Sequence, residues 1–297
     1  MNKLSLHLRS TLGLLSAAGL AMAASGATAG EHIPLVAQNG IQEVAKVISL
    51  GGSCNACELS GRDLSGATFI NATFLDSTFV GSNLRGSELI GSNFTGSDFS
   101  RADLTGVSIV GANFVRTVFV SASLSGAEAM GADFSAARLT GADFSSAELV
   151  GANFTHADLS NVDLSDAELF GANFQGANAA RADFSDAGLS GAGLSGGRFP
   201  NASFRDADLS AARFGGGVFT GADFNDAELT RADIRGADLS RVRNLTQAQI
   251  NHARCDAGTR LPRGLSTQGC TRAVPRPPTP PAPPRARHFV MAAGGGQ

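Results

Sequence analysis

The sequence predicts an all-β solenoid of four-sided coils between residues 58 and 242. Three observations predict it: an apolar residue at every fifth position, a small residue two positions before each of these, and a longer period of 20. The apolar position recurs from Leu59 to Leu239, which gives 37 consecutive centres, 33 of them Leu or Phe. A period of five fits neither a helix nor a strand. It fits a solenoid in which each unit forms one side of a coil and its centre points inward.

The period of 20 sets the number of sides in each coil. Phenylalanine recurs at every twentieth residue in one series, at Phe74, Phe94, Phe114, Phe134, Phe154 and Phe174. Leucine does so in another, at Leu149, Leu169, Leu189, Leu209 and Leu229. Four units therefore make one turn. At ~4.8 Å between neighbouring strands, the repeats form about nine coils and a rod roughly 45 Å long.

The first 29 residues have the features of a signal peptide. A basic start is followed by an apolar run over 11–23 that is shorter than the ~20 residues a membrane-spanning helix needs. Small residues allow cleavage after Ala23 or after Ala29, and the later site is favoured. The mature protein is expected to be periplasmic or secreted, with no membrane span left after cleavage.

The segments on either side of the repeats are predicted to close the ends of the rod with short helices. In the N-terminal flank, 30–57, apolar residues share one helical face at Ile41, Val44, Ala45 and Ile48. In the C-terminal cap, 243–270, Thr246 and Gln249 have capping-box spacing, with Leu245 and Ile250 available to cover the last coil. Residues 271–297 form a proline-rich tail with four arginines and no acid, which predicts an extended, disordered segment.

Four cysteines flank the repeats in two local pairs, Cys54 with Cys57 and Cys255 with Cys270. An even number of cysteines in an oxidising compartment favours structural disulfides. The Cys-Asn-Ala-Cys spacing of the first pair would also suit half of a zinc or redox site. No second motif of this kind and no histidine partner lies nearby in the sequence.

The segments LSGADFSSAELVGANFTHADLS and RADIRGADLS resemble the pentapeptide-repeat proteins. The flanks GSCNACELSG and NLTQAQINHARCDAGTRLPRGL are similar to those of exported members. The resemblance covers about 185 residues and implies a right-handed quadrilateral β-helix. It implies little about function, although the family includes cytoplasmic members that mimic duplex DNA and bind gyrase.

No catalytic constellation is evident. The four histidines that follow the signal peptide are scattered over the flank, the coils, the cap and the tail, at His32, His156, His252 and His288. Neither a triad nor a metal cluster is suggested. We expect no enzymatic activity, no cofactor and no bound metal.

Acidic residues recur on two neighbouring sides of the predicted coils. The aspartate column comprises Asp63, Asp103, Asp143, Asp163, Asp183 and Asp223. The glutamate column comprises Glu88, Glu128, Glu148, Glu168, Asp208 and Glu228. Residues 58–243 contain 13 Lys or Arg and 23 acids, a net charge of −10, so these columns form an acidic wall. Either the wall binds a cation or a basic partner, the protein's own Arg-bearing tail included, or an acid at this position assists the turn and is solvated.

An apolar stripe follows the centres on one side, where the repeat ordinarily has Ser or Thr. It consists of Ile70, Ile90, Val110, Met130, Val150 and Phe170. Six stacked apolar side chains on an outer surface approach the patch size that marks an interface. The interface would serve a partner, a homodimer or the protein's own flank at 31–50. The alternative is that β-branched residues suit strand-like positions, which does not account for Met130 and Phe170.

These features predict an exported, non-enzymatic scaffold that binds a protein partner or a second copy through its exterior faces, and not nucleic acid. One alternative is a DNA-mimicking inhibitor of a DNA-binding protein such as gyrase, which requires that residues 1–29 are not a signal peptide. Another is a cation-binding surface protein, for which calcium-dependent melting would be the test.

Overall fold

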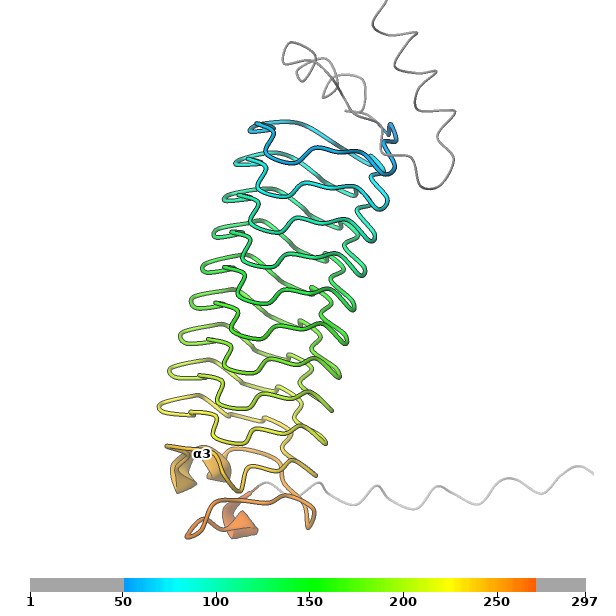
Figure 1. Ribbon diagram of the computed structural model, residues 1–297. Coiled ribbons are helices and arrows are strands. Elements are labelled where there is room, and N and C mark those ends of the chain that lie inside the picture. The colour runs from blue at the N-terminus through cyan, green and yellow to red at the C-terminus, as the bar shows by residue number, and fades with distance from the viewer. Residues whose placement is uncertain (1–50, 271–297) are drawn as a thin grey trace, which may run out of the picture.

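The computed structural model describes residues 51–270, which form a straight rod of stacked coils (Figure 1). The predicted signal peptide, the predicted N-terminal helix and the proline-rich tail lie outside these residues. The residue before each centre forms a parallel bridge with the residue 20 positions later, from Ser53 with Thr73 to Asp223 with Arg243. Four five-residue units therefore make one coil, as the period of 20 predicts.

The interior of the rod is a continuous column of apolar centres and small residues. All 37 predicted centres are buried, and the phenylalanines of one series stack ring upon ring. The ring centroids of Phe74 and Phe94 are 5.2 Å apart with planes at 2°, and Phe94 and Phe114 are also 5.2 Å apart. A small residue two positions before the centre leaves room for such rings, because its side chain also points inward.

In the units from Leu59 to Ile234 the chain turns its corner at the second residue after the centre, which has a positive φ. Glycine takes this conformation without steric cost, as at Gly111 with φ of 63°. Aspartate and asparagine tolerate it better than most side chains, as at Asp166 with φ of 58°. The corner explains the Gly that closes the repeat in the sequence.

The coil ladder begins at Ser53, five residues before the predicted start of the repeats. Cys54 continues the fivefold series in the place of a Leu or Phe centre, and Cys57 occupies the small position of the next unit. The two are disulfide-bonded, with Cα atoms 5.6 Å apart. The first disulfide therefore lies inside the first described coil.

The C-terminal end is closed by the helix α3, Gln247–Asn251, and the short 3₁₀ helix η1, Thr267–Gly269. The predicted capping box is present, since Thr246 and Gln249 bond to one another's backbone. The Gln249 amide also donates to the carbonyls of Phe224 and Ala227, both at 2.8 Å, and so satisfies acceptors of the coil next to the cap.

The cap is fastened to the ladder. Arg254 and Arg260 form parallel bridges to Asp233 and Asp238 of the coil above, so two segments of the cap continue the ladder of the rod. The predicted disulfide between Cys255 and Cys270 is present, with Cα atoms 5.7 Å apart. No helix within residues 51–270 has the length and apolarity to cross a membrane.

Candidate functional site

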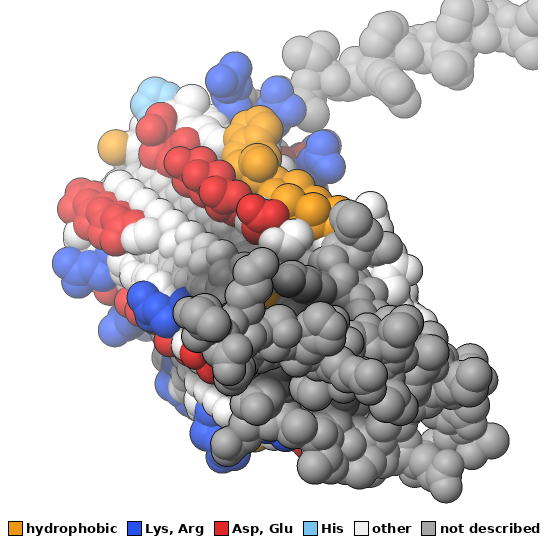
Figure 2. Space-filling view, turned by 90° about the horizontal axis from the view of Figure 1, so that it is seen from above, with side chains coloured by type: hydrophobic (Ala, Val, Ile, Leu, Met, Phe, Trp, Pro, Cys, Tyr) orange, Lys and Arg blue, Asp and Glu red, His pale blue; other side chains and the backbone are white. Residues whose placement is uncertain are grey.

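The apolar stripe and the glutamate column lie on the same side of the rod, which we call the stripe face. In each unit the residues before and after the centre both point outward, and the two columns therefore run in parallel. Glu88, Glu128, Glu148 and Glu168 each lie in the same unit as one residue of the stripe. Parallel bridges stack Glu128, Glu148 and Glu168 directly on one another. Figure 2 shows a band of hydrophobic side chains beside a band of acidic ones along the rod.

Exposure is concentrated at two positions of the stripe. Met130 is 42% exposed and Phe170 is 61% exposed, whereas Ile70, Ile90, Val110 and Val150 are half-buried against their neighbours. In the described part of the chain, the only other large hydrophobic side chain with comparable exposure is Val218, on another side of the rod. The stripe face is thus the one with stacked, accessible apolar groups.

The aspartates of the acidic wall are used by the fold. The carboxylate of Asp143 accepts a hydrogen bond from the Ser145 N–H at 2.9 Å. Asp163 and Asp183 each accept from both the N–H and the hydroxyl of the serine two residues later. The same bond from Ser65 lowers the pKa of Asp63. The alternative interpretation, that an acid here assists the turn, therefore holds for the aspartate column.

The carboxylates of the glutamates on the stripe face do not take part in the turns. Glu128, Glu148 and Glu168 are exposed, and none of their carboxylates has a hydrogen-bond or ion-pair partner within residues 51–270. The residue two positions after each is apolar and has no hydroxyl to donate. Of the acids compared here, Asp143, Asp163 and Asp183 therefore belong to the turns, whereas the carboxylates of Glu128, Glu148 and Glu168 remain free to bind.

The stripe face ends where this arrangement ends. Two coils below Glu168, Asp208 accepts hydrogen bonds from the hydroxyl of Ser190 at 2.7 Å and from the N–H of Ser210 at 2.9 Å. Partial burial of Asp208 would raise its pKa, but these bonds outweigh burial and lower it. The aspartate–serine turn thus returns below Phe170, and it marks the lower limit of the surface.

A glycine edge borders the stripe on the side away from the glutamates. It consists of corner residues in six consecutive coils, Gly91, Gly111, Gly131, Gly151, Gly171 and Gly191. A Cβ built at any of the last five would meet nothing within 4 Å. Sequence reasoning missed this edge, although its signal is a glycine at every twentieth residue. It leaves the stripe open to approach from one side.

A third acidic column, also missed, lies at the corner on the glutamate side. It consists of Asp166, Asp186, Asp206 and Asp226, all with φ between 55° and 61°. In the lower coils the corner column continues the acidic surface between the aspartate and glutamate columns. Its signal in the sequence is an aspartate where earlier coils have glycine.

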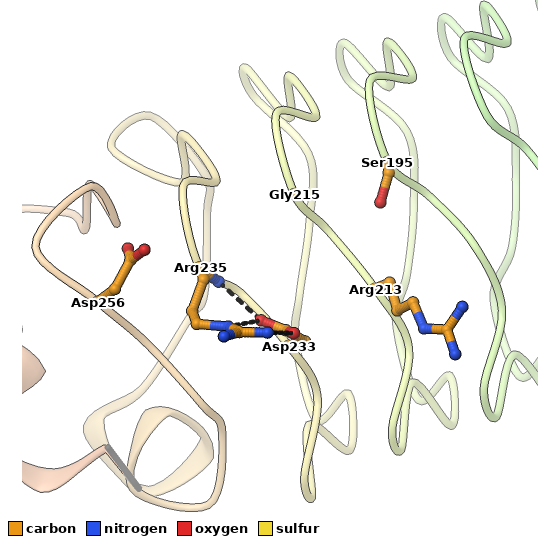
Figure 3. A pocket seen from close by; sticks show the side chains of 6 residues that line it. All are labelled: Ser195, Arg213, Gly215, Asp233, Arg235 and Asp256. Carbon is orange, nitrogen blue, oxygen red and sulfur yellow. Dashed lines mark hydrogen bonds and ion pairs between the residues drawn. The ribbon is translucent and has the colours of Figure 1, made fainter. Parts of the chain in front are cut away.

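A hollow of about 270 Å³ lies near the C-terminal end, on a different side of the rod (Figure 3). The Nε of Arg235 donates to Asp233 at 2.7 Å, and this bond lowers the pKa of Asp233. In Figure 3 the side chain of Arg213 points away from this pair. The hollow thus contains a mutually satisfied ion pair. Within residues 51–270 no group of three or more His, Cys, Asp or Glu is arranged to hold a metal ion.

Stacked coils, a buried apolar column and outward-facing side-chain ladders define a repeat protein whose chemistry lies in its surfaces. The family model for pentapeptide repeats matches the chain in eight copies, over residues 57–96, 97–135, 130–166, 167–206 and 202–241. The chain belongs to the pentapeptide repeat family. Proteins of this family fold as right-handed quadrilateral β-helices and are generally structural or binding proteins, not enzymes.

Several solved structures are similar to this chain. QnrB1, a plasmid-mediated fluoroquinolone resistance protein, is 20% identical over 68% of this chain and 91% of its own, with a TM-score of 0.43. HetL from Nostoc sp. strain PCC 7120, involved in heterocyst differentiation regulation, is 24% identical over 65% and 94%, with a TM-score of 0.28. A pentapeptide repeat protein from the Arabidopsis thaliana thylakoid lumen is 28% identical over 47% and 70%, with a TM-score of 0.26. No curated protein matches significantly.

Proposed function

We propose that this protein is an exported, non-enzymatic scaffold that binds a protein partner through the stripe face. The observation that carries the proposal is the position of two exposed apolar groups, Met130 and Phe170, beside three unpaired carboxylates. The fold requires neither column. A partner that covers the stripe would bury apolar surface, and its basic groups would form ion pairs with the glutamates.

The size of the surface suits a short segment of a partner. From Ile70 to Phe170 the stripe crosses five coil steps, or about 24 Å at ~4.8 Å per step. One turn of an α-helix rises ~5.4 Å, close to one coil step, so a helix along the rod could place one apolar side chain against each coil. A basic amphipathic helix is therefore a good probe of the face.

Charge argues against a second copy as the partner. The units that form the stripe face, from residue 67 to 230, contain no Lys or Arg on that side. Face-to-face pairing of two copies would bring two glutamate columns to one interface with no cation between them. Like charges in such positions cost stability and suppress association.

The test is binding of a fluorescent 18-residue peptide of Leu and Lys in amphipathic order to the processed protein, measured by anisotropy. The variant V110S/M130S/F170S is expected to bind about 100-fold more weakly, because it removes on the order of 3 kcal/mol of apolar burial. The variant E128Q/E148Q/E168Q is expected to lose about tenfold, at roughly 0.5 kcal/mol per charge pair.

A matched control separates a site from general attraction to an acidic rod. The variant D166N/D186N/D206N removes the same number of charges from the acidic corner column, and asparagine tolerates the left-handed corner. It is expected to retain the affinity of the parent protein for the peptide. Equal weakening by both charge variants, or no effect of the apolar substitutions, would contradict the proposal.

The corner column supports a second candidate function, a DNA-mimicking inhibitor of a DNA-binding protein such as gyrase. Aspartates repeat there in four consecutive coils, next to further acids of both columns, with Arg205 as the basic residue that interrupts this surface. This candidate predicts the reverse result: D166N/D186N/D206N loses binding to a DNA-binding protein, and duplex DNA competes. N-terminal sequencing of protein from fractionated cells decides between them, since an intact Met1 in the cytoplasm would favour the inhibitor.

A further inference from the structure

Cationic groups would complement the glutamates of the stripe face, and the chain itself contains a segment that has them. Residues 271–297 include four arginines and no acid, at Arg272, Arg276, Arg285 and Arg287. The flank that precedes the rod is a poor match, because 30–50 contains Glu31, Glu43 and Lys46, a net charge of −1. Charge complementarity therefore selects the C-terminal segment over the N-terminal one.

The same segment also offers apolar groups next to its charges. Its sequence runs Arg285-Ala-Arg287-His-Phe289-Val-Met291. Three consecutive apolar side chains follow two arginines, which corresponds to the two columns of the stripe face. The Pro-rich stretch before it, 275–284, favours an extended spacer over a folded one.

The segment can reach the face. Cys270 is held at the end of the rod by its disulfide to Cys255. The ladder passes from Asn173 through Gly193, Arg213 and Asp233 to Arg254, so the coil of Phe170 lies four steps above the cap, or about 19 Å at ~4.8 Å per step. The 19 residues from Cys270 to Phe289 span up to about 59 Å at ~3.1 Å per residue. The tether is long enough for either side of the rod and short enough for an effective concentration of about 1 mM.

The lower stripe face offers polar partners as well as apolar ones. The N–H groups of Met130, Val150 and Phe170 have no acceptor within residues 51–270, whereas the equivalent N–H of Ser145 bonds to Asp143. These N–H groups lie between the glutamates and the stripe. They are available to the carbonyl groups of a segment that lies along the face.

We propose that residues 285–291 dock intramolecularly on the lower stripe face and compete there with the external partner. Arg285 and Arg287 pair with Glu148 and Glu168, and Phe289 to Met291 cover Val150 and Phe170. The inference rests on the proposed function of the stripe face, since it assigns the regulation of that same site.

The test uses the absence of tryptophan from the natural sequence. The full-length processed F289W protein carries a single tryptophan in the docking segment, and A282W carries one in the spacer as a matched control. The F289W protein is expected to show blue-shifted emission and weak acrylamide quenching, while A282W shows the emission of a tryptophan in water. Raising the ionic strength from 0.1 to 1 M, which shortens the Debye length from ~10 to ~3 Å, should weaken the protection.

Variants of the rod identify the surface that the segment occupies. In the F289W background, E148Q/E168Q/F170S is expected to return the emission to that of the A282W control. The substitution V218S removes an apolar group of 37% exposure from another side and should leave the emission unchanged. An emission already like that of A282W, or one that stays blue-shifted after E148Q/E168Q/F170S, would overturn the proposal.

Peptide binding distinguishes failure of this inference from failure of the proposed function. The variant R285Q/R287Q/F289S, which has an intact rod, is expected to bind the Leu–Lys peptide about tenfold more tightly, if the tail docks with an intrinsic Kd near 0.1 mM. If R285Q/R287Q/F289S binds the peptide with the same affinity as the parent protein and the F289W tryptophan is exposed, docking of the tail is refuted. The proposed function of the stripe face is then unaffected. A protected tryptophan with no peptide binding in either protein refutes the external partner and leaves the docked tail.

Discussion

Gly197 offers a sharp test of how the core is packed, because replacing it by the family's preferred alanine should destabilise the rod. It occupies the small position two residues before Phe199, where 25 of the 37 units have Ala. A Cβ at Gly197 would lie 2.7 Å from the Cε2 of Phe199 and 3.1 Å from the Phe174 carbonyl oxygen. The Phe199 ring is held in place by Phe219, which stacks on it with centroids 5.0 Å apart and planes at 4°.

The magnitude follows from two opposing effects. Overpacking a filled core costs about 1–3 kcal/mol. Replacing glycine by alanine also lowers the entropy of the unfolded chain, which stabilises the protein by about 0.4–1 kcal/mol. We expect a net loss of roughly 1–2 kcal/mol for G197A, measured as the free energy of unfolding in urea by far-UV circular dichroism.

Gly188 provides the matched control. It lies on the outer surface of the stripe-face ladder, its φ is not positive, and an added Cβ would approach only the Ala167 carbonyl, at 4.0 Å. G188A should therefore stabilise the rod by about 0.4–1 kcal/mol through the unfolded state alone. If G197A proves as stable as the parent protein, or G188A is destabilised equally, the packing argument is wrong.

Three further predictions concern the cap, acid stability and the second disulfide. Q249E replaces the amide that donates to Phe224 and Ala227 by a carboxylate facing two carbonyls, and should cost about 2–3 kcal/mol in urea unfolding, whereas Q268E in η1 should be neutral. Partial burial raises the pKa of Asp158, but hydrogen bonds from Ser160, Thr140 and Asn178 outweigh it, so the folded-state pKa is lowered. The stability that Asp158 contributes is present above its unfolded pKa and is lost as pH falls below about 4. D158N should therefore reduce the slope of the free energy of unfolding against pH at acid pH. An unchanged slope would contradict this. C255S/C270S opens a loop with a sequence separation of 15 and should lower the cap's stability by about 3 kcal/mol, seen as faster amide exchange over 254–270; unchanged exchange there would show that the ladder alone holds the cap.

The fold was predictable from the sequence because the repeat is locally complete. Each unit supplies its own inward centre, small residue and corner, so the positions of Leu59 to Leu239 follow from counting. The period of 20 then fixes which centres stack, and the bridges reproduce that register. The first coil was placed too late because Cys54 occupies a centre without being Leu or Phe.

The candidate site was predictable in part. The members of the apolar stripe follow from register alone, and so does their presence on one side of the rod. Whether an acid takes part in the turn depends on whether its carboxylate accepts a hydrogen bond from the residue two positions later. That distinction is visible in Asp143-Phe-Ser145 against Glu148-Leu-Val150, but charge alone does not reveal it.

The exposure of the stripe residues could not be predicted by counting positions in the sequence. Val150 is half-buried whereas Phe170 is 61% exposed, because a β-branched side chain lies against its neighbours and a long aromatic ring extends past them. The openness of the face also depends on the glycine edge, which matters only once the corner is known to border the stripe. Such properties depend on neighbours one coil away, not on the repeat itself.

The two kinds of unit show that the stripe face is not imposed by the fold. The ladder bond from the Glu148 N–H to the Ala127 carbonyl is 2.9 Å long, and the equivalent bond from Asp143 to Ala122 is also 2.9 Å. The backbone is thus indifferent to whether an aspartate completes the turn. Yet the glutamate units forgo a side-chain acceptor for the N–H of Val150 and stack like charges that repel by about 1 kcal/mol per pair in water. A ligand with arginines and carbonyl oxygens would offset both costs, and its apolar groups would cover the exposed Met130 and Phe170, so the stripe face is better explained by binding than by folding.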